Sequence, residues 1–146
     1  MSERSERTDG SVRARTHRRA QRGDRDRVVR LGSGGPYEER IGYSRVVRAG
    51  PWVLTAGCTS TVDGDAYAQA VAAFRVALDA VAKAGGATAD VVRTRMYVVR
   101  PEDCAAVGRA HGDVFADVRP VATMVVVAGL IDPAMLVEVE VEAYVP

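Results

Sequence analysis

The sequence has few cysteines and no long apolar run, and each of these absences excludes a class of protein. Its two cysteines, Cys58 and Cys104, show neither the spacing of a metal site nor the pattern of a disulfide framework, so we expect reduced thiols and no bound metal. No apolar run is long enough to span a membrane, and the beginning lacks the apolar core of a signal peptide. The sequence therefore predicts a soluble, cytoplasmic protein that does not bind membranes.

Features of nucleotide and nucleic-acid binding are also scarce. The glycine-rich stretch 32–36 lacks the Lys-Ser/Thr ending of a phosphate-binding loop and does not open a helix, so a flexible connector is the better interpretation. Lys83 is the only lysine, and the net charge of the whole chain is only +1. Such a balance argues against a dedicated nucleic-acid-binding protein.

Most of the clustered positive charge lies at the start of the chain. Residues 1–27 are mainly Ser, Thr, Arg, Asp and Gly, with almost no large apolar side chain. Such a segment cannot offset the entropy lost on ordering, so we predict a disordered, arginine-rich tail. Its arginines could contact RNA, but the interleaved Asp24 and Asp26 dilute the charge and favour a solvated tail. Residues 28–146 have the length of one ordinary domain.

The hydrophobic pattern after residue 40 predicts the element order β-β-α-β-α-β-β. A tight turn at 49–51 joins the first two strands into a hairpin. The bounds of the helices are marked by residues that begin or end helices. The first helix follows Asp65 and stops at the glycine pair 85–86, and the second opens at Pro101. The predicted strands are 41–48, 52–57, 90–100, 118–127 and 136–144. The predicted helical stripes are Ala70, Phe74, Ala77, Leu78 and Val81, then Cys104, Val107, Ala110, Val114 and Phe115.

One face of the predicted sheet carries charged side chains. Alternation along 136–144 places three glutamates on one face, and alternation along 90–100 separates two sets of side chains. Two helices can cover only one face of such a sheet, so we expect the other face to be buried between copies of the chain. The two predicted sets are Val92, Thr94, Met96 and Val98 on the covered face, and Arg93, Arg95, Tyr97 and Val99 on the open face.

Several short strings, in order, resemble the Rid family, the reactive intermediate deaminases, which are also called the YjgF or L-PSP family. The strings cover roughly residues 42–144 and are 42–44, 54–57, 90–94, 119–123 and 137–143. The resemblance implies an α+β, chorismate-mutase-like fold and a homotrimer with a barrel-like core and three clefts between subunits. It also implies hydrolysis of small 2-imino or 2-enamino acids to 2-keto acids and ammonia without a cofactor.

The resemblance also implies roles for particular residues. Tyr43 matches the family tyrosine near the first strand, Gly57 the glycine whose backbone meets the ligand, and Glu140 the acid that positions water. The arginine that clamps the substrate carboxylate is replaced by Ala122. Alanine cannot provide bidentate recognition of a carboxylate, so we expect a substrate other than a standard 2-imino acid. The family asparagine in the second helix is replaced by Gly108.

Other residues of the predicted cleft each have two interpretations. Arg95 either pairs with Glu138, Glu140 or Glu142 across the trimer interior or replaces the missing clamp. Glu140 is a general base or a salt-bridged sheet residue, with Glu138 and Glu142 structural.

His111 is a proton shuttle or a hydrogen-bonded packing residue. Cys58 either lines the mouth of the cleft or is a buried, inert thiol. Thr123 and Met124 are expected to line a pocket more apolar than a carboxylate site.

These expectations lead to three hypotheses of function. The first is a trimeric enzyme that uses Glu140, Tyr43 and His111 in water or proton transfer on an imine, an enamine or a related carbonyl-derived metabolite. Gly57, Cys58, Arg95, Ala122, Thr123 and Met124 would bind the substrate. The second is a non-catalytic trimer that binds a metabolite, and the third is an RNA-directed activity tethered by the tail.

Overall fold

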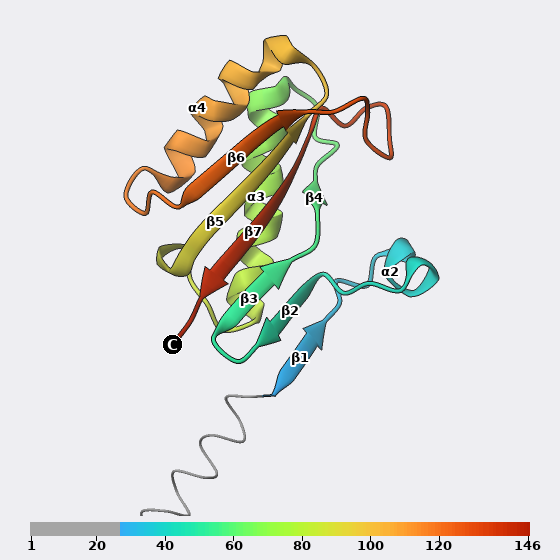
Figure 1. Cartoon of the computed structure of the whole chain (residues 1–146). Helices are drawn as coiled ribbons and strands as arrows, with labels where there is room; N and C mark the ends of the chain where they lie inside the picture. The colour runs from blue at the N-terminus through green and yellow to red at the C-terminus, as the bar shows by residue number, and fades with distance from the viewer. Residues whose placement is uncertain (1–26) are drawn as a thin grey trace, which may run out of the picture.

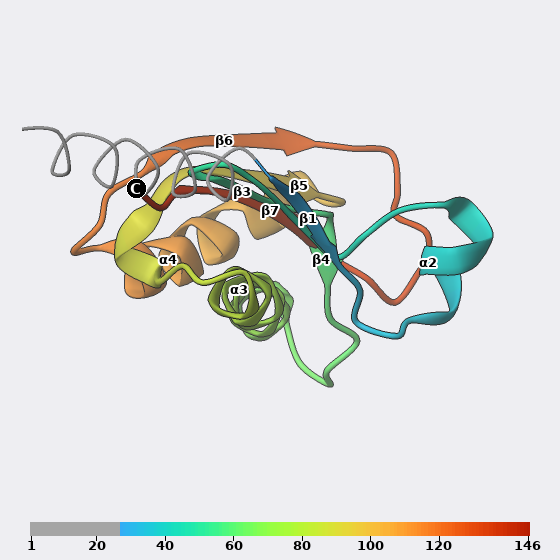
Figure 2. The same ribbon diagram turned by 90° about the horizontal axis from the view of Figure 1, so that it is seen from below.

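A twisted, seven-stranded sheet with two long helices on one face forms the main body of the computed structural model (Figures 1 and 2). The structure describes residues 27–146, so the predicted tail lies outside the described residues except for Arg27, which is exposed and has no regular structure. The strands are β1 (Val28–Leu31), β2 (Val46–Ala49), β3 (Trp52–Thr55), β4 (Cys58–Thr59), β5 (Val91–Val98), β6 (Val121–Val126) and β7 (Val137–Tyr144). The helices are α2 (Pro36–Ile41), α3 (Ala66–Lys83) and α4 (Cys104–Phe115), with 3-10 turns at Thr88–Asp90 and Pro101–Asp103.

The sheet has the order β1-β2-β3-β7-β5-β6, with β4 paired separately to β7. All pairs are antiparallel except β5 with β6, whose connection through α4 crosses over on the helical side. Strand β6 is thus an edge strand in the single chain. No helix within residues 27–146 is long and apolar enough to cross a membrane.

Helix α3 forms where the alanine-rich pattern predicts it. The Asp65 carboxylate accepts a hydrogen bond from the Ala68 N–H at 3.0 Å and so caps the first turn. Its buried face is mostly alanine, which lets the helix lie close to the sheet. Phe74 is the large side chain of this face, and its ring packs edge-on against Phe115 of α4 at 5.2 Å between centroids. The core therefore lies between the helices and one face of the sheet.

Three elements near the start of the domain are absent from the predicted order. Residues 28–31 pair with β2 as β1, and the supposed flexible connector leads into the short helix α2. Gly42 ends α2 in the left-handed conformation, with φ of 84°, so the predicted strand 41–48 begins only at Val46. The third element, β4, has two residues and pairs only with β7. Such short elements are stabilised by tertiary pairing and leave no periodic pattern.

The predicted faces of β5 are correct except at its start. A register shift against β7 between Val91 and Arg93 is a β-bulge, which turns one residue out of the alternation. Val91 is therefore buried, at 3% exposure, and Val92 is 39% exposed, the reverse of the predicted placement of Val92.

The opposite face of the sheet is not covered by any helix within residues 27–146 (Figure 2). The row of three glutamates on β7 runs along its centre, beside the arginines of β5. Exposed apolar side chains flank this charged centre, and Trp52 and Tyr144 contact each other edge-on at 5.2 Å between centroids. The exposed apolar residues of this face are Val28, Trp52, Leu54, Val121, Val125 and Tyr144.

Candidate functional site

The three glutamates of β7 lie opposite three residues of β5 on the uncovered face. In the antiparallel register, Glu138 pairs with Tyr97, Glu140 with Arg95 and Glu142 with Arg93. The residues between the glutamates point into the core, which fixes the carboxylates on the other side. The alternation of β7 therefore produces the predicted row of carboxylates.

Arg95 neutralises two of these carboxylates. Its Nη1 donates to Glu142 Oε1 at 2.6 Å and to Glu140 Oε2 at 3.3 Å. The ion-pair interpretation of Arg95 is thus confirmed, although the pairs form between neighbouring strands of one chain and not across a trimer. Arg93 lies 3.7 Å from Glu142. Arg95 is therefore held by two carboxylates through Nη1.

Both oxygens of Glu140 have hydrogen-bond donors. Oε2 accepts from Arg95, and Oε1 accepts from the Tyr97 hydroxyl at 2.9 Å. Burial and this bond to a carboxylate raise the pKa of Tyr97, so its hydroxyl stays protonated and remains a donor. Glu140 is therefore held in a fixed orientation by two neighbours on β5.

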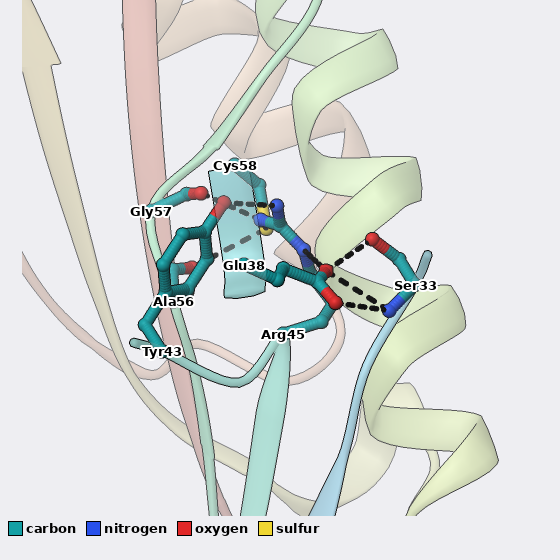
Figure 3. Close-up of polar contacts among 7 residues, drawn as sticks. All are labelled: Ser33, Glu38, Tyr43, Arg45, Ala56, Gly57 and Cys58. Carbon is teal, nitrogen blue, oxygen red and sulfur yellow. Dashed lines mark hydrogen bonds and ion pairs between the residues drawn. The ribbon is translucent and has the colours of Figure 1, made fainter. Parts of the chain in front are cut away.

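A second polar cluster, centred on Arg45, lies where β2 and β4 begin (Figure 3). Arg45 Nη1 donates to the Gly57 carbonyl at 2.7 Å, Nη2 lies 3.5 Å from the Tyr43 hydroxyl, and Nε lies 3.8 Å from Glu38. Glu38 also accepts from the side chain and the backbone N–H of Ser33, and these bonds lower its pKa. The cluster thus fixes Tyr43 and Gly57, two of the residues carried over from the resemblance.

Sequence reasoning missed both Arg45 and Glu38. Arg45 was taken as an ordinary residue of strand 41–48, and Glu38 belongs to a helix that was not predicted. The available signal was a pair of opposite charges beside Tyr43, but such pairs are common at protein surfaces and do not indicate a site.

Glu138 connects the row of carboxylates to the Arg45 cluster. Its carboxylate lies directly over the Cα of Gly57, because a Cβ there would overlap Glu138 Oε1 and approach its Cδ to 2.7 Å. Within residues 27–146 the carboxylate of Glu138 makes no hydrogen bond and no ion pair within 4 Å, unlike those of Glu140 and Glu142. Burial, and then the charge of Glu140, raise its pKa, while Arg45 acts in the opposite direction.

The thiol of Cys58 does not line a cleft in this subunit. It is fully buried, donates to the Ala56 carbonyl at 3.3 Å and lies 3.5 Å from Arg45 Nη1. Burial raises its pKa, so the reactive thiolate is disfavoured. The expectation that Cys58 binds substrate is thus corrected, and the alternative of a buried, inert thiol fits its position.

His111 lies on the other side of the sheet from Glu140. Its Nε2 is 2.8 Å from the hydroxyl of the buried Thr94, and its ring packs against Phe74 and Phe115. Burial lowers its pKa and favours the neutral imidazole. The structure therefore does not bring His111 together with Glu140 and Tyr43, and its contacts are those of a packing residue.

The contact between Thr94 and His111 leads to a stability prediction. Replacing Thr94 by valine keeps the shape but leaves the imidazole without its partner, which should lower the free energy of unfolding by about 1–3 kcal/mol. Urea unfolding measures this, and Thr61→Val, the same change at an exposed position in the loop before α3, should stay within about 0.5 kcal/mol of wild type. Equal stability of the two variants would contradict a structural bond at His111.

The sheet also divides the predicted pocket residues on β6. Ala122 and Met124 pair with the buried Thr94 and Met96, so their side chains lie on the helical side. Thr123 pairs with Arg95 and lies on the carboxylate side. Gly108 of α4 faces Met124, since a Cβ there would lie 3.8 Å from its Cε. The position that the family arginine would occupy therefore lies at a strand edge lined by small or apolar side chains.

Two further properties of the described part are relevant to the site. Among residues 27–146, no group of three or more His, Cys, Asp or Glu side chains is arranged to hold a metal ion. An open hollow of about 420 Å³ lies beside His111 at the start of β6, lined by Phe115, Arg119 and Pro120 among others. It is on the helical side, apart from the carboxylates.

Comparison with known proteins places this arrangement in a wider group. The model of the family described as endoribonuclease L-PSP matches residues 37–145. An uncharacterized protein of Streptomyces coelicolor is 46% identical over 123 residues, which is 80% of this chain and 92% of that protein.

Solved structures agree with this match. A Mycobacterium tuberculosis member of the highly conserved YjgF/YER057c/UK114 family is 44% identical, with a TM-score of 0.79 over 82% of this chain and 100% of that one. A protein of unknown function from Pseudomonas aeruginosa is 27% identical, with a TM-score of 0.73 over 82% of this chain and 93% of that one.

Proposed function

Because the chain belongs to the endoribonuclease L-PSP family, also called the YjgF or Rid family, we propose that it is a homotrimeric enzyme acting on a small imine, enamine or related carbonyl-derived metabolite. The reaction takes place in clefts between subunits and needs no cofactor. Each cleft combines the Tyr43, Gly57 and carboxylate side of one subunit with the Ala122 and Met124 edge of the next.

The observation that carries the proposal is the separation of the two half-sites within one chain. Glu140 and Tyr97 lie on the uncovered face, whereas Ala122 and Met124 lie on the helical side of the edge strand β6. A sheet cannot bring its two faces together, but a second copy can place its uncovered face against the edge of the first. The exposed valines of β6 favour such a contact, because an unpaired apolar edge strand is rarely left in water.

The chemistry that fits this cleft is hydrolysis of a carbon–nitrogen double bond. A carboxylate takes a proton from water as the water oxygen adds to the imine carbon, and it returns this proton to the nitrogen. The carboxylate then passes the remaining hydroxyl proton of the adduct to the nitrogen, so that the C–N bond breaks, the carbonyl forms and ammonia or an amine leaves. The Tyr43 hydroxyl, held beside Arg45, donates a hydrogen bond to the developing oxygen or to the water.

The test follows from Ala122. Without a guanidinium at that position, 2-iminopropionate, whose carboxylate needs the clamp, should be hydrolysed slowly or not at all, whereas an imine without a carboxylate should be hydrolysed. Ammonia release and carbonyl formation from freshly generated imines measure this. Rapid turnover of 2-iminopropionate would refute the changed substrate, and no turnover of any imine would refute the enzyme.

A second candidate is a non-catalytic trimer that binds a metabolite, and the engagement of both Glu140 oxygens favours it. In that case a ligand raises the melting temperature, while Glu140→Gln changes no cellular phenotype.

The family description as an endoribonuclease supports an RNA-directed activity as a third candidate. The carboxylates of the uncovered face oppose it, because they repel phosphates. Salt-dependent RNA binding that is lost when residues 1–27 are deleted would support this third function.

A further inference from the structure

A single guanidinium connects two candidate site residues that come from different segments of the chain (Figure 3). Arg45 Nη2 lies 3.5 Å from the Tyr43 hydroxyl, and Nη1 donates to the Gly57 carbonyl at 2.7 Å. The guanidinium carbon also lies over the Tyr43 ring, 5.8 Å from its centroid. Because a guanidinium is planar and rigid, these contacts fix the tyrosine relative to the backbone at Gly57.

Arg45 is itself held in place by the protein. Its side chain is 17% exposed, and its Nε lies 3.8 Å from Glu38, whose side chain is 11% exposed. Glu38 in turn accepts hydrogen bonds from the backbone and the hydroxyl of Ser33. A largely buried guanidinium is costly unless it is paired, and here a carbonyl and a carboxylate offset that cost. The position of Arg45 is therefore set by groups of the chain and does not depend on a ligand.

The bond between Arg45 and Tyr43 has a defined direction. A guanidinium offers only N–H donors, so the Tyr43 oxygen is the acceptor in this bond. The hydroxyl proton is then left for another acceptor, and a bond received from a cation makes the hydroxyl a better donor. At 3.5 Å the bond is long, and catalytic hydrogen bonds often tighten only when the substrate is bound. Arg45 therefore favours an acceptor atom as the ligand of Tyr43.

We infer that Arg45 is a positioning residue of the cleft, which holds the Tyr43 hydroxyl as a hydrogen-bond donor to an acceptor atom of the substrate. The inference rests on the proposed function for the reaction, and it adds a residue to which the resemblance assigns no role. In this role Arg45 acts through Tyr43 and not on the substrate itself. Its loss should lower kcat more than it changes KM, because the bond from Tyr43 strengthens as charge develops on the acceptor.

Replacement of Arg45 should reduce turnover of an imine without a carboxylate. Arg45→Gln removes the charge and shortens the side chain, so kcat should fall at least about tenfold with little change in KM. Arg45→Lys keeps a charged donor but loses the planar fork, and it should retain part of the activity. The lysine variant also keeps the inference testable if Arg45→Gln does not fold.

Arg48 provides the matched control for a purely structural role. It lies on β2, is also partly buried, and donates to the carbonyls of Gly50, Ala84 and Val145. None of these groups belongs to the candidate site. Arg48→Gln should therefore lower the free energy of unfolding, measured with urea, as Arg45→Gln does, but it should leave kcat and KM unchanged.

A double-mutant cycle shows whether Arg45 acts through Tyr43. Tyr43→Phe removes the hydroxyl that Arg45 holds, so the double variant with Arg45→Gln should lose much less activity than the product of the two single losses. Tyr43→Phe combined with Arg48→Gln should lose only what Tyr43→Phe loses alone. A role of Arg45 in stability alone would not produce this difference.

The surroundings of the Tyr43 ring give a readout that does not depend on turnover. In protein that carries 3-fluorotyrosine, the fluorine NMR signal of Tyr43 is the one that Tyr43→Phe removes. This signal should move in Arg45→Gln and stay in place in Arg48→Gln, because the Arg45 guanidinium lies over the ring.

The outcomes separate the two proposals. If wild type hydrolyses no imine, the proposed function fails, and the fluorine signal alone decides whether Arg45 holds Tyr43. If imines are hydrolysed, coupled losses of kcat at Tyr43 and Arg45 support the inference. It is overturned if Arg45→Gln keeps the kcat of wild type, or if its loss multiplies with that of Tyr43→Phe. A fluorine signal that moves no more in Arg45→Gln than in Arg48→Gln also overturns it.

Discussion

Alanine at position 57 is expected to impair imine turnover while leaving the fold intact. The added methyl group would overlap the Glu138 carboxylate, which is the end of a flexible side chain and so moves away without displacing the backbone. Glu138 is then displaced from its place over Gly57, and the methyl group occupies the side of Gly57 on which the carboxylate lies. Turnover of an imine without a carboxylate should fall at least about tenfold, because a displacement of about 1 Å at the cleft is enough to misplace the substrate.

A matched glycine gives the control for this prediction. Gly112 lies on α4, and a Cβ there would contact nothing within 4 Å. Gly112→Ala should therefore keep full imine turnover and raise the free energy of unfolding by about 0.5–1 kcal/mol, because alanine favours the helix. If Gly57→Ala hydrolyses the imine as fast as Gly112→Ala does, the placement of Glu138 against Gly57 has no role in the site.

Aspartate in place of Val125 is expected to convert the proposed trimer into single subunits. Val125 is 43% exposed on the edge strand β6, on the same face as the row of carboxylates. In the proposed trimer this side chain is buried against another copy, and burying an unpaired charge there costs more than one subunit contact can supply. Sedimentation should show the mass falling from three chains to one, with loss of turnover.

Val62 provides the control for the oligomer. It is 44% exposed, in the loop before α3 on the helical side of the sheet (Figure 2). Val62→Asp should therefore sediment as wild type does. A wild-type protein that sediments as one chain, or a Val125→Asp variant that remains trimeric, would contradict the proposed assembly and with it the composite cleft.

Much of the fold follows from local pattern. The alanine-rich stripe that follows Asp65 in the sequence predicts α3, and the alternation along β7 predicts the row of glutamates. Both could be predicted because each signal lies within one continuous segment. The predicted α+β fold and family are confirmed by the matches to known proteins. The ion pair of Arg95 was also predictable, since both strands alternate and must place their polar faces on the same side.

The Arg45 cluster could not be predicted in the same way. Its members come from α2, from the loop before β2 and from the loop before β4, and none of these segments has a periodic pattern. The left-handed turn at Gly42 and the contact of Glu138 with Gly57 bring them together. The choice between the two interpretations of His111 also depended on the tertiary structure, because a helix residue beside the apolar stripe can still face the sheet and pack against Phe115.

The sequence by itself determined the family, the two long helices, the alternating strands and the loss of the arginine at position 122. These properties depend on residue identity and on spacing within a segment. Only the tertiary structure decided which carboxylates of residues 27–146 are paired with arginines and which face each candidate residue occupies. The reason is physical: the charge of a glutamate is set by its sequence, but its neutralisation depends on which side chains the folded sheet places within a few ångströms.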